Sequence, residues 1–315
     1  MHSKTGFWAC CALALSMSHA AFAAEPASCK KLTLAEIGWA DITATNAIAS
    51  VVAEGLGYQP QQMMASVPIA FTGVSNKQID VFLGYWSPSM DPVVKPFIDS
   101  NRVKVLDTPN LVGAKYTLAV PTYAAEAGLK SFNDIAKFKE QLGGKIYAIE
   151  PGNEGNDMIA AMIKANQFDL SGFKMVESSE SGMLVQVQRA VKDKKPVVFL
   201  AWAPHPMNTK LDITYLDGGD EVFGPDHGAA QVLTVITTDL EERCPNLGKL
   251  FTNLQFDVEM ENQMMERILE KEAPKQVAAD WLRQNPATIE KWLEGVTSYD
   301  GEDGVVAVKR HLNIQ

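Results

Sequence analysis

Short apolar segments alternate with segments of helical periodicity along most of this 315-residue chain, and this alternation restricts its fold more than any other feature. Short apolar runs suit strands, and the segments between them repeat apolar residues at helical spacing. Such alternation is typical of α/β proteins with largely parallel sheets. The expected strands are residues 32–39, 79–84, 103–106, 116–120, 145–149, 173–177, 197–202, 213–216 and 232–237. The expected helices include residues 44–54, 132–141, 156–166 and 181–191, with Asn156 as the N-cap of the third.

The last part of the chain has a different character. After Thr238 the pattern is almost entirely helical, and Trp281 and Trp292 lie there at the spacing of core residues. No flexible linker marks a domain boundary, so two domains would be joined by short strands, with residues 110–114 and 207–211 as candidate crossings. The expected C-terminal helices are residues 247–254, 258–270, 274–283 and 286–293.

The first residues have the features of a secretory signal peptide. Lys4 gives a positive start, residues 7–17 are mostly apolar, and Ala21 and Ala23 supply the small side chains that a signal peptidase requires. A buried N-terminal helix is the alternative, but the polar residues that follow favour a signal. We therefore expect residues 1–23 to be removed and the mature chain to be exported to the periplasm.

The predicted signal peptide also determines which cysteines remain in the mature chain. Cys10 and Cys11 lie within the predicted signal peptide, which leaves Cys29 and Cys244 in the mature chain. Two cysteines in an exported chain are expected to form one disulfide, with two free thiols as the alternative. A bridge across so long a loop would stabilise the fold by about 2–5 kcal/mol. It would tie the mature N-terminus to the start of the C-terminal helices.

The charge balance limits the partners of the protein. Lys and Arg number 28 against 38 Asp and Glu, which gives a formal net charge of −10. Nucleic acids and anionic membranes require a basic surface, so neither is an expected partner. Apart from the N-terminus, no apolar run is long enough to span a bilayer. The expected class is a soluble protein of one or two domains whose partner could be a cation.

Three tryptophans share one topological position. Trp39, Trp86 and Trp202 each lie at the end of an expected strand, beside glycine, alanine or proline. Ligands of parallel α/β sheets bind just beyond the carboxyl ends of the strands. For any one of these rings the alternative is core packing. Several rings around one cavity would form a cage for a quaternary ammonium group, which has no hydrogen-bond donors and is held by ring faces.

An acidic residue lies close to the first of these tryptophans. The carboxylate of Asp41 would neutralise a buried cation and would repel a ligand that carries its own carboxylate. The alternative role of Asp41 is the N-cap of a helix that starts near Thr43. The two roles are compatible, because a cap uses only one oxygen.

These segments resemble the choline-binding proteins of bacterial ABC importers, within the betaine/carnitine/choline substrate-binding family. The likeness runs from about Cys29 to the C-terminus, and its motifs are specific only when taken together. It implies a two-lobed, type II-like periplasmic binding protein fold, in which two α/β lobes joined by two crossing strands close on the ligand. The matching motifs are residues 38–41 (GWAD), 82–86 (FLGYW), 116–121 (YTLAVP), 149–153 (IEPGN) and 202–208 (WAPHPMN).

The resemblance also implies a set of ligand-binding residues. In relatives that bind choline, four rings surround the trimethylammonium group, an aspartate follows the first tryptophan, and an asparagine binds the hydroxyl. Without the resemblance, Tyr116 would be a core residue and Asn153 a turn or capping residue. Tyr85 and His205 are additional candidates; His205 could donate to a ligand carboxylate, although a hinge or surface role is preferred. The matching residues are Trp39, Trp86, Tyr116 and Trp202 for the rings, Asp41 for the aspartate and Asn153 for the asparagine.

The expected organisation and partners follow. Residues 24–112 and 209–315 would form one discontinuous lobe and residues 113–208 the other, and Cys29 and Cys244 match the cysteine pair of the family. The expected partners are choline or a related quaternary ammonium ligand and an inner-membrane ABC permease with its ATPase. We expect a monomer that binds no nucleic acid.

An enzymatic function is not expected. The histidines of the mature chain, His205, His227 and His311, lie far apart without metal-ligand spacing, and neither a nucleophile elbow nor a P-loop occurs. We therefore expect no catalytic residue, metal or cofactor. Two alternatives stay open, namely a glycine betaine/carnitine-binding protein of the same transporter class and a sensor subunit that presents its ligand to a receptor.

Overall fold

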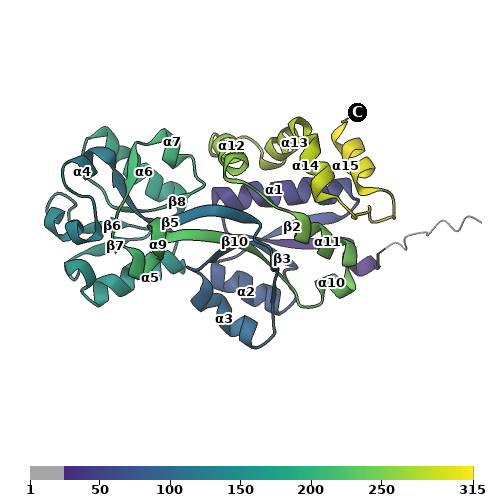
Figure 1. Cartoon of the computed structure of the whole chain (residues 1–315), viewed down its shortest axis with the longest axis horizontal. Helices are drawn as coiled ribbons and strands as arrows, with labels where there is room; N and C mark the ends of the chain where they lie inside the picture. Colours follow the sequence, from purple (N-terminus) through teal and green to yellow (C-terminus); the bar gives the residue numbers. More distant parts are fainter. Residues whose placement is uncertain (1–24, 315) are drawn as a thin grey trace, which may run out of the picture.

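The computed structural model describes residues 25–314, so the predicted signal peptide lies outside the described residues. Ten strands in this part of the chain form one mixed sheet, and helices pack around it (Figure 1). The strands are β1 (Lys31–Glu36), β2 (Gln59–Met64), β3 (Val81–Ser87), β4 (Lys104–Val105), β5 (Leu111–Pro121), β6 (Lys145–Tyr147), β7 (Lys174–Val176), β8 (Phe199–Ala203), β9 (Ile213–Tyr215) and β10 (Ala229–Ile236). Their order is β2-β1-β3-β10-β5-β8-β6-β7, with β4 paired to β10 and β9 paired to β5.

The sheet is parallel at its two ends and antiparallel in the middle. β1 pairs in parallel with β2 and β3, and β6 pairs in parallel with β7 and β8. Between these ends, β3, β10, β5 and β8 are antiparallel neighbours. The α/β class is therefore confirmed, but the expectation of largely parallel sheets is wrong for the centre. The reason is that the chain crosses the middle in both directions, through β5 and back through β10.

Every strand expected from the sequence has a counterpart, but β2 was not anticipated. Its sequence is rich in glutamine, and its residues are mostly exposed because β2 lies at the edge of the sheet, paired only with β1. A strand without a buried face shows no alternation of apolar and polar residues, which is the signal used to recognise strands.

The two central strands connect two groups of elements. The first half of β5 pairs with β10, whereas its second half pairs with β8 and β9. Figure 1 shows β5 and β10 running between a group that contains α4 to α9 and a group that contains the two ends of the described chain. Residues 110–114, expected as the first crossing, contain the start of β5. Residues 207–211, expected as the second crossing, instead contain a short helix (Met207–Lys210), and the chain returns through β10.

Most of the helices that were expected from the sequence have a counterpart close to the expected position. The segment expected as a helix at residues 132–141 is a 3₁₀-helix over Phe132–Phe138, and several helices, including the last one, α15, were not anticipated. The helices are α1 (Ala40–Gly55), α2 (Val67–Ser75), α3 (Asp91–Asp99), α4 (Thr122–Glu126), α5 (Glu154–Lys164), α6 (Glu180–Lys192), α7 (Met207–Lys210), α8 (Asp220–Phe223), α9 (Pro225–Gly228), α10 (Leu240–Arg243), α11 (Pro245–Asn253), α12 (Val258–Leu269), α13 (Pro274–Gln284), α14 (Pro286–Trp292) and α15 (Gly304–Leu312).

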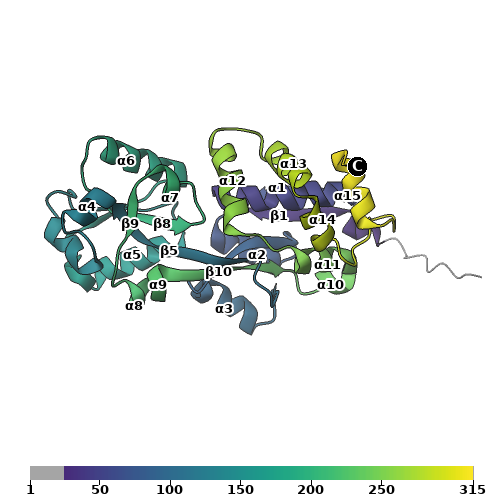
Figure 2. The ribbon, with the colours of Figure 1, turned by 45° about the horizontal axis from the view of Figure 1, so that its top comes forward.

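Helix α1 lies at the centre of its group. Nearly all of its side chains are buried, because α12, α13 and α15 pack along it (Figure 2). Trp292 is buried in this helical layer and stacks on the half-buried Trp281, with ring centroids 6.1 Å apart, so the core assignment of both is confirmed. The C-terminal helices thereby fix the position of α1, whose first residue lies at the functional site described below.

The expected disulfide is present between Cys29 and Cys244, whose Cα atoms are 5.7 Å apart. It ties the segment before β1 to the junction of α10 and α11, as the sequence predicted.

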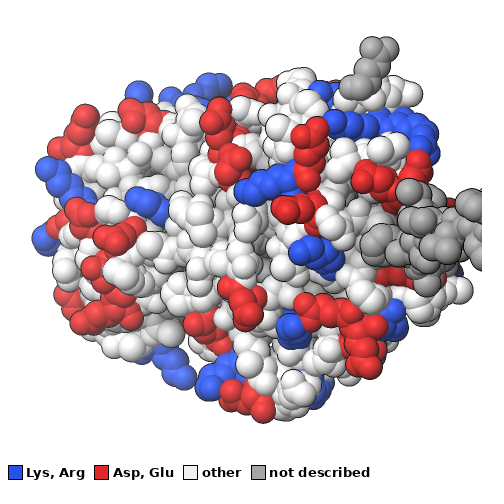
Figure 3. Space-filling view, turned by 45° about the vertical axis from the view of Figure 1, so that its right-hand side comes forward, with Lys and Arg blue, Asp and Glu red and all other residues white. Residues whose placement is uncertain are grey.

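Acidic and basic side chains are interspersed over the face shown in Figure 3. Within residues 25–314, the helices are too short or too polar to cross a membrane.

Candidate functional site

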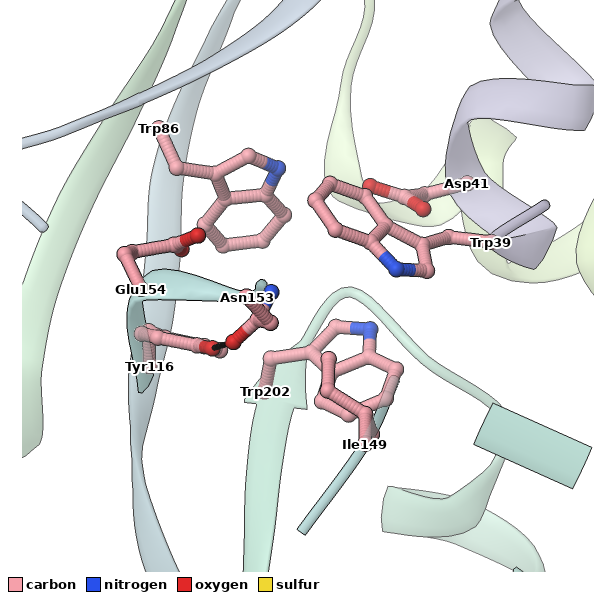
Figure 4. Close-up of a pocket in the computed structure, with 8 residues that line it drawn as sticks. All are labelled: Trp39, Asp41, Trp86, Tyr116, Ile149, Asn153, Glu154 and Trp202. Atoms are coloured by element: carbon pink, nitrogen blue, oxygen red, sulfur yellow. Dashed lines mark hydrogen bonds between the residues drawn. The ribbon is translucent and has the colours of Figure 1, made fainter. Parts of the chain in front are cut away.

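One pocket lies between the two groups of elements and is lined by residues from both. Its cavity measures about 20 Å³, which is far below the roughly 300–1,000 Å³ of pockets that hold drug-sized ligands. Its size therefore suits a small molecule. The lining residues are Trp39, Asp41, Trp86, Tyr116, Ile149, Asn153, Glu154 and Trp202 (Figure 4).

Four aromatic rings form most of the wall, and the fold brings them together from four separate elements. Trp39 precedes α1, Trp86 lies near the end of β3, Tyr116 lies on β5 and Trp202 lies on β8. Tyr116 and Trp202 are direct partners across the β5–β8 pair, so their side chains lie on the same face of the sheet. The rings of Trp86 and Tyr116 have centroids 6.0 Å apart.

Hydrogen bonds fix the orientation of two of these rings. The indole N–H of Trp39 donates to Oε1 of Glu150 at 2.9 Å, and the hydroxyl of Tyr116 donates to Oδ1 of Asn153 at 2.7 Å. Tyr116 approaches α5 so closely that a Cβ at Gly155 would lie 2.2 Å from its hydroxyl oxygen. Glycine is therefore required at the second position of α5.

Asn153 is the N-cap of α5, and the geometry assigns a free donor to its side chain. Its Oδ1 accepts from the Tyr116 hydroxyl and from the backbone N–H of Gly155. Two donors at one atom identify that atom as the oxygen, so the other atom is the nitrogen. This Nδ2 is buried without a partner, and Figure 4 shows it directed into the pocket. The expected cap at Asn156 is wrong, since that side chain bonds to the backbone of Ile149 and Glu150.

Asp41 brings a buried carboxyl group to one wall of the pocket. Its Oδ1 atom is buried without a hydrogen-bond partner. Burial, and next the charge of Glu180, raise the pKa of Asp41 to about 7. The suggested role of Asp41 as an N-cap is wrong: α1 begins at Ala40, so Asp41 lies inside its first turn. The carboxylate is thus free to act on whatever occupies the pocket.

Glu154 brings a second buried carboxyl group to the facing wall. Its Oε1 accepts from the hydroxyl of Ser89 at 3.3 Å, whereas its Oε2 is buried without a partner. Burial raises the pKa of Glu154 to about 7, and the charges of Glu150 and Asp157 add to this effect. Among the described residues, those that line the pocket include no Lys, Arg or His. The site therefore offers unpaired negative charge and ring faces, a combination suited to a cation without hydrogen-bond donors.

The six residues that the sequence assigned to a ligand all line this pocket, from segments far apart in the chain. The suggested capping role of Asn153 is also realised, and the two roles are compatible because the cap uses only Oδ1.

The two additional candidates lie elsewhere. The hydroxyl of Tyr85 donates to Asp91, and the ring packs edge-on against Phe71, away from the pocket. His205 lies behind Trp202, with ring centroids 5.1 Å apart, and is 1% exposed. A surface role for His205 is therefore wrong. It contacts Glu180 rather than the pocket.

Sequence reasoning missed Glu154 and Ile149. Glu154 is the first residue of α5, directly after the glycine-containing turn that carries Asn153. An acidic residue at the start of a helix is ordinarily a solvated complement to the helix dipole, so the residue type gave no signal. Only its burial between β3 and α5 identifies it.

No three His, Cys, Asp or Glu residues are grouped as metal ligands among the described side chains.

Comparison with known protein families identifies the architecture. Residues 30–284 match the family OpuAC, described as the substrate binding domain of ABC-type glycine betaine transport systems. A solved structure, "ABC-transporter choline binding protein in complex with choline", is 50% identical with a TM-score of 0.89; the match covers 91% of this chain and all of that one.

Two curated relatives are also similar. Uncharacterized protein ORF1 of Chromohalobacter salexigens is 49% identical over 138 residues, which is 44% of this chain and 86% of that protein. Glycine betaine/carnitine transport binding protein GbuC of Listeria monocytogenes is 29% identical over 202 residues, and the match spans 64% of each protein.

The raised pKa values of the two pocket carboxyls predict a specific pH dependence of stability. Carboxyl groups in the unfolded chain titrate near pH 4, whereas Asp41 and Glu154 titrate near pH 7 in the folded protein. The folded state then holds more protons than the unfolded state between these values, so their contribution to stability decreases as the pH rises from 4 to 7. In thermal melts of the ligand-free protein, the Tm of Asp41→Asn minus the Tm of the wild type should therefore increase as the pH rises from 4 to 7.

The matched control is Asp107→Asn at an exposed position, whose Tm difference from the wild type should stay constant over the same range. Equal pH slopes for the wild type and Asp41→Asn would contradict the prediction.

Proposed function

We propose that this chain, which belongs to the family of substrate-binding domains of ABC-type glycine betaine transport systems, captures choline for import. The single observation that carries the proposal is the pocket itself. Four rings and two carboxyl groups, each with one oxygen that has no hydrogen-bond partner, enclose it, with no basic side chain among its lining residues. The structure that is 50% identical, a choline binding protein with choline, supports the same ligand.

The rings and Asp41 account for the cationic end of choline. A trimethylammonium group cannot be hydrogen-bonded, so its affinity comes from ring faces, at roughly 0.5–2 kcal/mol for each ring when desolvated. Four rings can therefore supply most of the roughly 8 kcal/mol of micromolar binding. Asp41 adds charge neutralisation from the first turn of α1.

Asn153 and Glu154 account for the hydroxyl end. Two buried groups without partners lie on consecutive residues, the donor Nδ2 of Asn153 and the acceptor Oε2 of Glu154. A hydroxyl both accepts and donates, so one hydroxyl can satisfy both groups. A ligand carboxylate can only accept, and it would meet the charge of Glu154. This pair therefore favours choline over glycine betaine, the ligand class in the name of the family.

The remaining assignments are part of the same proposal. The protein works as a monomer in the periplasm after loss of residues 1–23, and the disulfide between Cys29 and Cys244 is consistent with an oxidising compartment. It delivers its ligand to an inner-membrane ABC permease with its ATPase, and its role is capture rather than catalysis. We propose lobes of residues 24–112 with 229–315 and of residues 113–228, since β10 is the returning strand.

Calorimetry of the purified mature protein tests the ligand. We expect choline to bind at micromolar affinity or better, and glycine betaine to bind at least about tenfold more weakly, because one lost charge-assisted hydrogen bond costs about that factor. Carnitine keeps a hydroxyl at the same position but adds a carboxylate, which would meet the charge of Glu154, so it should also bind more weakly than choline. Acetylcholine, which has an ester in place of the hydroxyl, should also bind more weakly. Tighter binding of glycine betaine than of choline would overturn the choline assignment in favour of the betaine/carnitine alternative.

The substitution Glu154→Gln tests the hydroxyl end. Glutamine can still accept from Ser89 but would present a donor where Oε2 now accepts. The pocket would then offer two donors, so we expect choline affinity to fall about tenfold or more while glycine betaine affinity rises. The control is Glu126→Gln, an exposed position on α4. An unchanged ratio of the two affinities in Glu154→Gln would remove Glu154 from ligand selection.

The pH dependence of binding tests the charge balance. Burial raises the pKa values of Asp41 and Glu154 to about 7, and a bound cation favours their ionised forms. Choline binding should therefore release protons, and its affinity should weaken as the pH falls from 8 to 5.5, by up to about tenfold per pH unit for each proton. Calorimetry in buffers of different ionisation enthalpy counts these protons. A flat affinity with no proton release would contradict the prediction.

A further inference from the structure

The N-terminus of α1 is capped from the opposite side of the pocket. Trp39 is the N-cap residue of α1, and its side chain makes no capping hydrogen bond. The backbone N–H of Ala40 instead donates to Oε2 of Glu180 at 3.0 Å, in a buried contact between residues 140 positions apart. Glu180 begins α6, which lies in the other group of elements (Figures 1 and 2).

The second oxygen of Glu180 has an equally specific partner. Nε2 of His205 lies 3.2 Å from Oε1 of Glu180, and both side chains are buried. Nδ1 of His205 accepts from the backbone N–H of Met207 at 2.9 Å. A neutral imidazole that accepts at Nδ1 carries its proton at Nε2. The histidine therefore donates to Glu180, and its ring packs at the same time on Trp202.

These contacts connect the two sides of the ring cage. They run from Trp202 through His205 and Glu180 to Ala40, the residue next to Trp39. Trp39 and Trp202 come from different groups of elements, and neither Glu180 nor His205 lines the pocket. We infer that Glu180 is a positioning residue that holds the two sides of the cage together and so sets the lifetime of the bound ligand. The inference rests on the proposed function of the pocket.

The chemistry at this point requires an ionised carboxylate. Both hydrogen-bond partners of Glu180, the backbone N–H of Ala40 and Nε2 of His205, are donors, so the side chain between them must accept at two atoms. Glutamine offers one acceptor and would place its own N–H groups against a donor. The carboxylate also lies at the positive end of the dipole of α1. Its negative charge is unfavourable for the ionised form of the nearby Asp41 and raises the pKa of that group. A neutral residue at position 180 would avoid this repulsion.

A second contact between the two groups of elements supplies a natural control. The ammonium group of Lys210 on α7 lies 3.1 Å from Glu266 and 3.0 Å from Glu270 at the end of α12. These side chains are half exposed, so solvent screens their interaction. Lys210→Gln should therefore leave ligand release almost unchanged.

Stopped-flow tryptophan fluorescence with choline tests the inference. We expect Glu180→Gln to raise koff about tenfold or more, which is the factor for loss of a hydrogen bond to a charged group, with kon nearly unchanged. His205→Phe keeps a ring against Trp202 but removes the donor, so it should raise koff in the same direction. In the double variant, the increase in koff should not exceed the combined increases of the two single variants, because both substitutions remove the same connected contact. A koff for folded Glu180→Gln within about twofold of the wild type would overturn the inference.

A ligand-free measurement separates this inference from the proposed function. The amide proton of Ala40 should exchange with solvent about tenfold faster in Glu180→Gln than in the wild type, and at the wild-type rate in Lys210→Gln. Unchanged exchange in Glu180→Gln would overturn the role of Glu180 whatever the ligand. If the wild type binds glycine betaine and not choline, the choline assignment fails, and the koff comparison is made with glycine betaine.

Discussion

Buried carboxyl groups without basic partners are the constraint on which this structure depends. Asp41 and Glu154 each keep one oxygen without a partner inside the pocket, and an unpaired charge in a protein interior is costly. Protons reduce that cost, because burial raises the pKa of each group to about 7. A cation among the rings would reduce the cost without protons. The carboxyl groups whose ionisation is costly here are therefore the groups that favour a cation in the pocket.

Helix N-termini make this concentration of acid tolerable. Asp41, Glu154 and Glu180 lie in the first turns of α1, α5 and α6, where the helix dipole favours negative charge. Helix α1 meets the site from one group of elements, and α5 and α6 meet it from the other (Figure 1). The backbone thus supplies part of the positive potential that basic side chains would otherwise supply, and no Lys or Arg has to enter the pocket and compete with a cationic ligand. Ring faces complete the wall without adding charge.

Much of the site could be predicted because its residues are unusual for their positions. Trp39, Trp86 and Trp202 follow or end strands beside small residues, which made them recognisable as ring faces rather than core. Glu154 and Glu180 could not be predicted, because an acidic residue that begins a helix is ordinarily exposed. Strand β2 could not be predicted either, since an edge strand without a buried face carries no alternating pattern. The return was placed too early because Met207–Lys210 form a short helix, and the chain re-enters the centre of the sheet only at β10.

The sequence by itself determined the α/β class, the helical C-terminal region, the pairing of two cysteines and the three tryptophan rings, because each of these depends on local pattern or residue type. The fourth ring, Tyr116, was identified only through the family resemblance. Only the tertiary structure decided which carboxylates are unpaired, which atom of Asn153 is a free donor, and which residue caps α1. Those properties depend on burial and on contacts between residues that lie up to 140 positions apart. Burial changes the energy of a charge far more than it changes that of a ring, so it is the charges of this site that the sequence alone leaves undetermined.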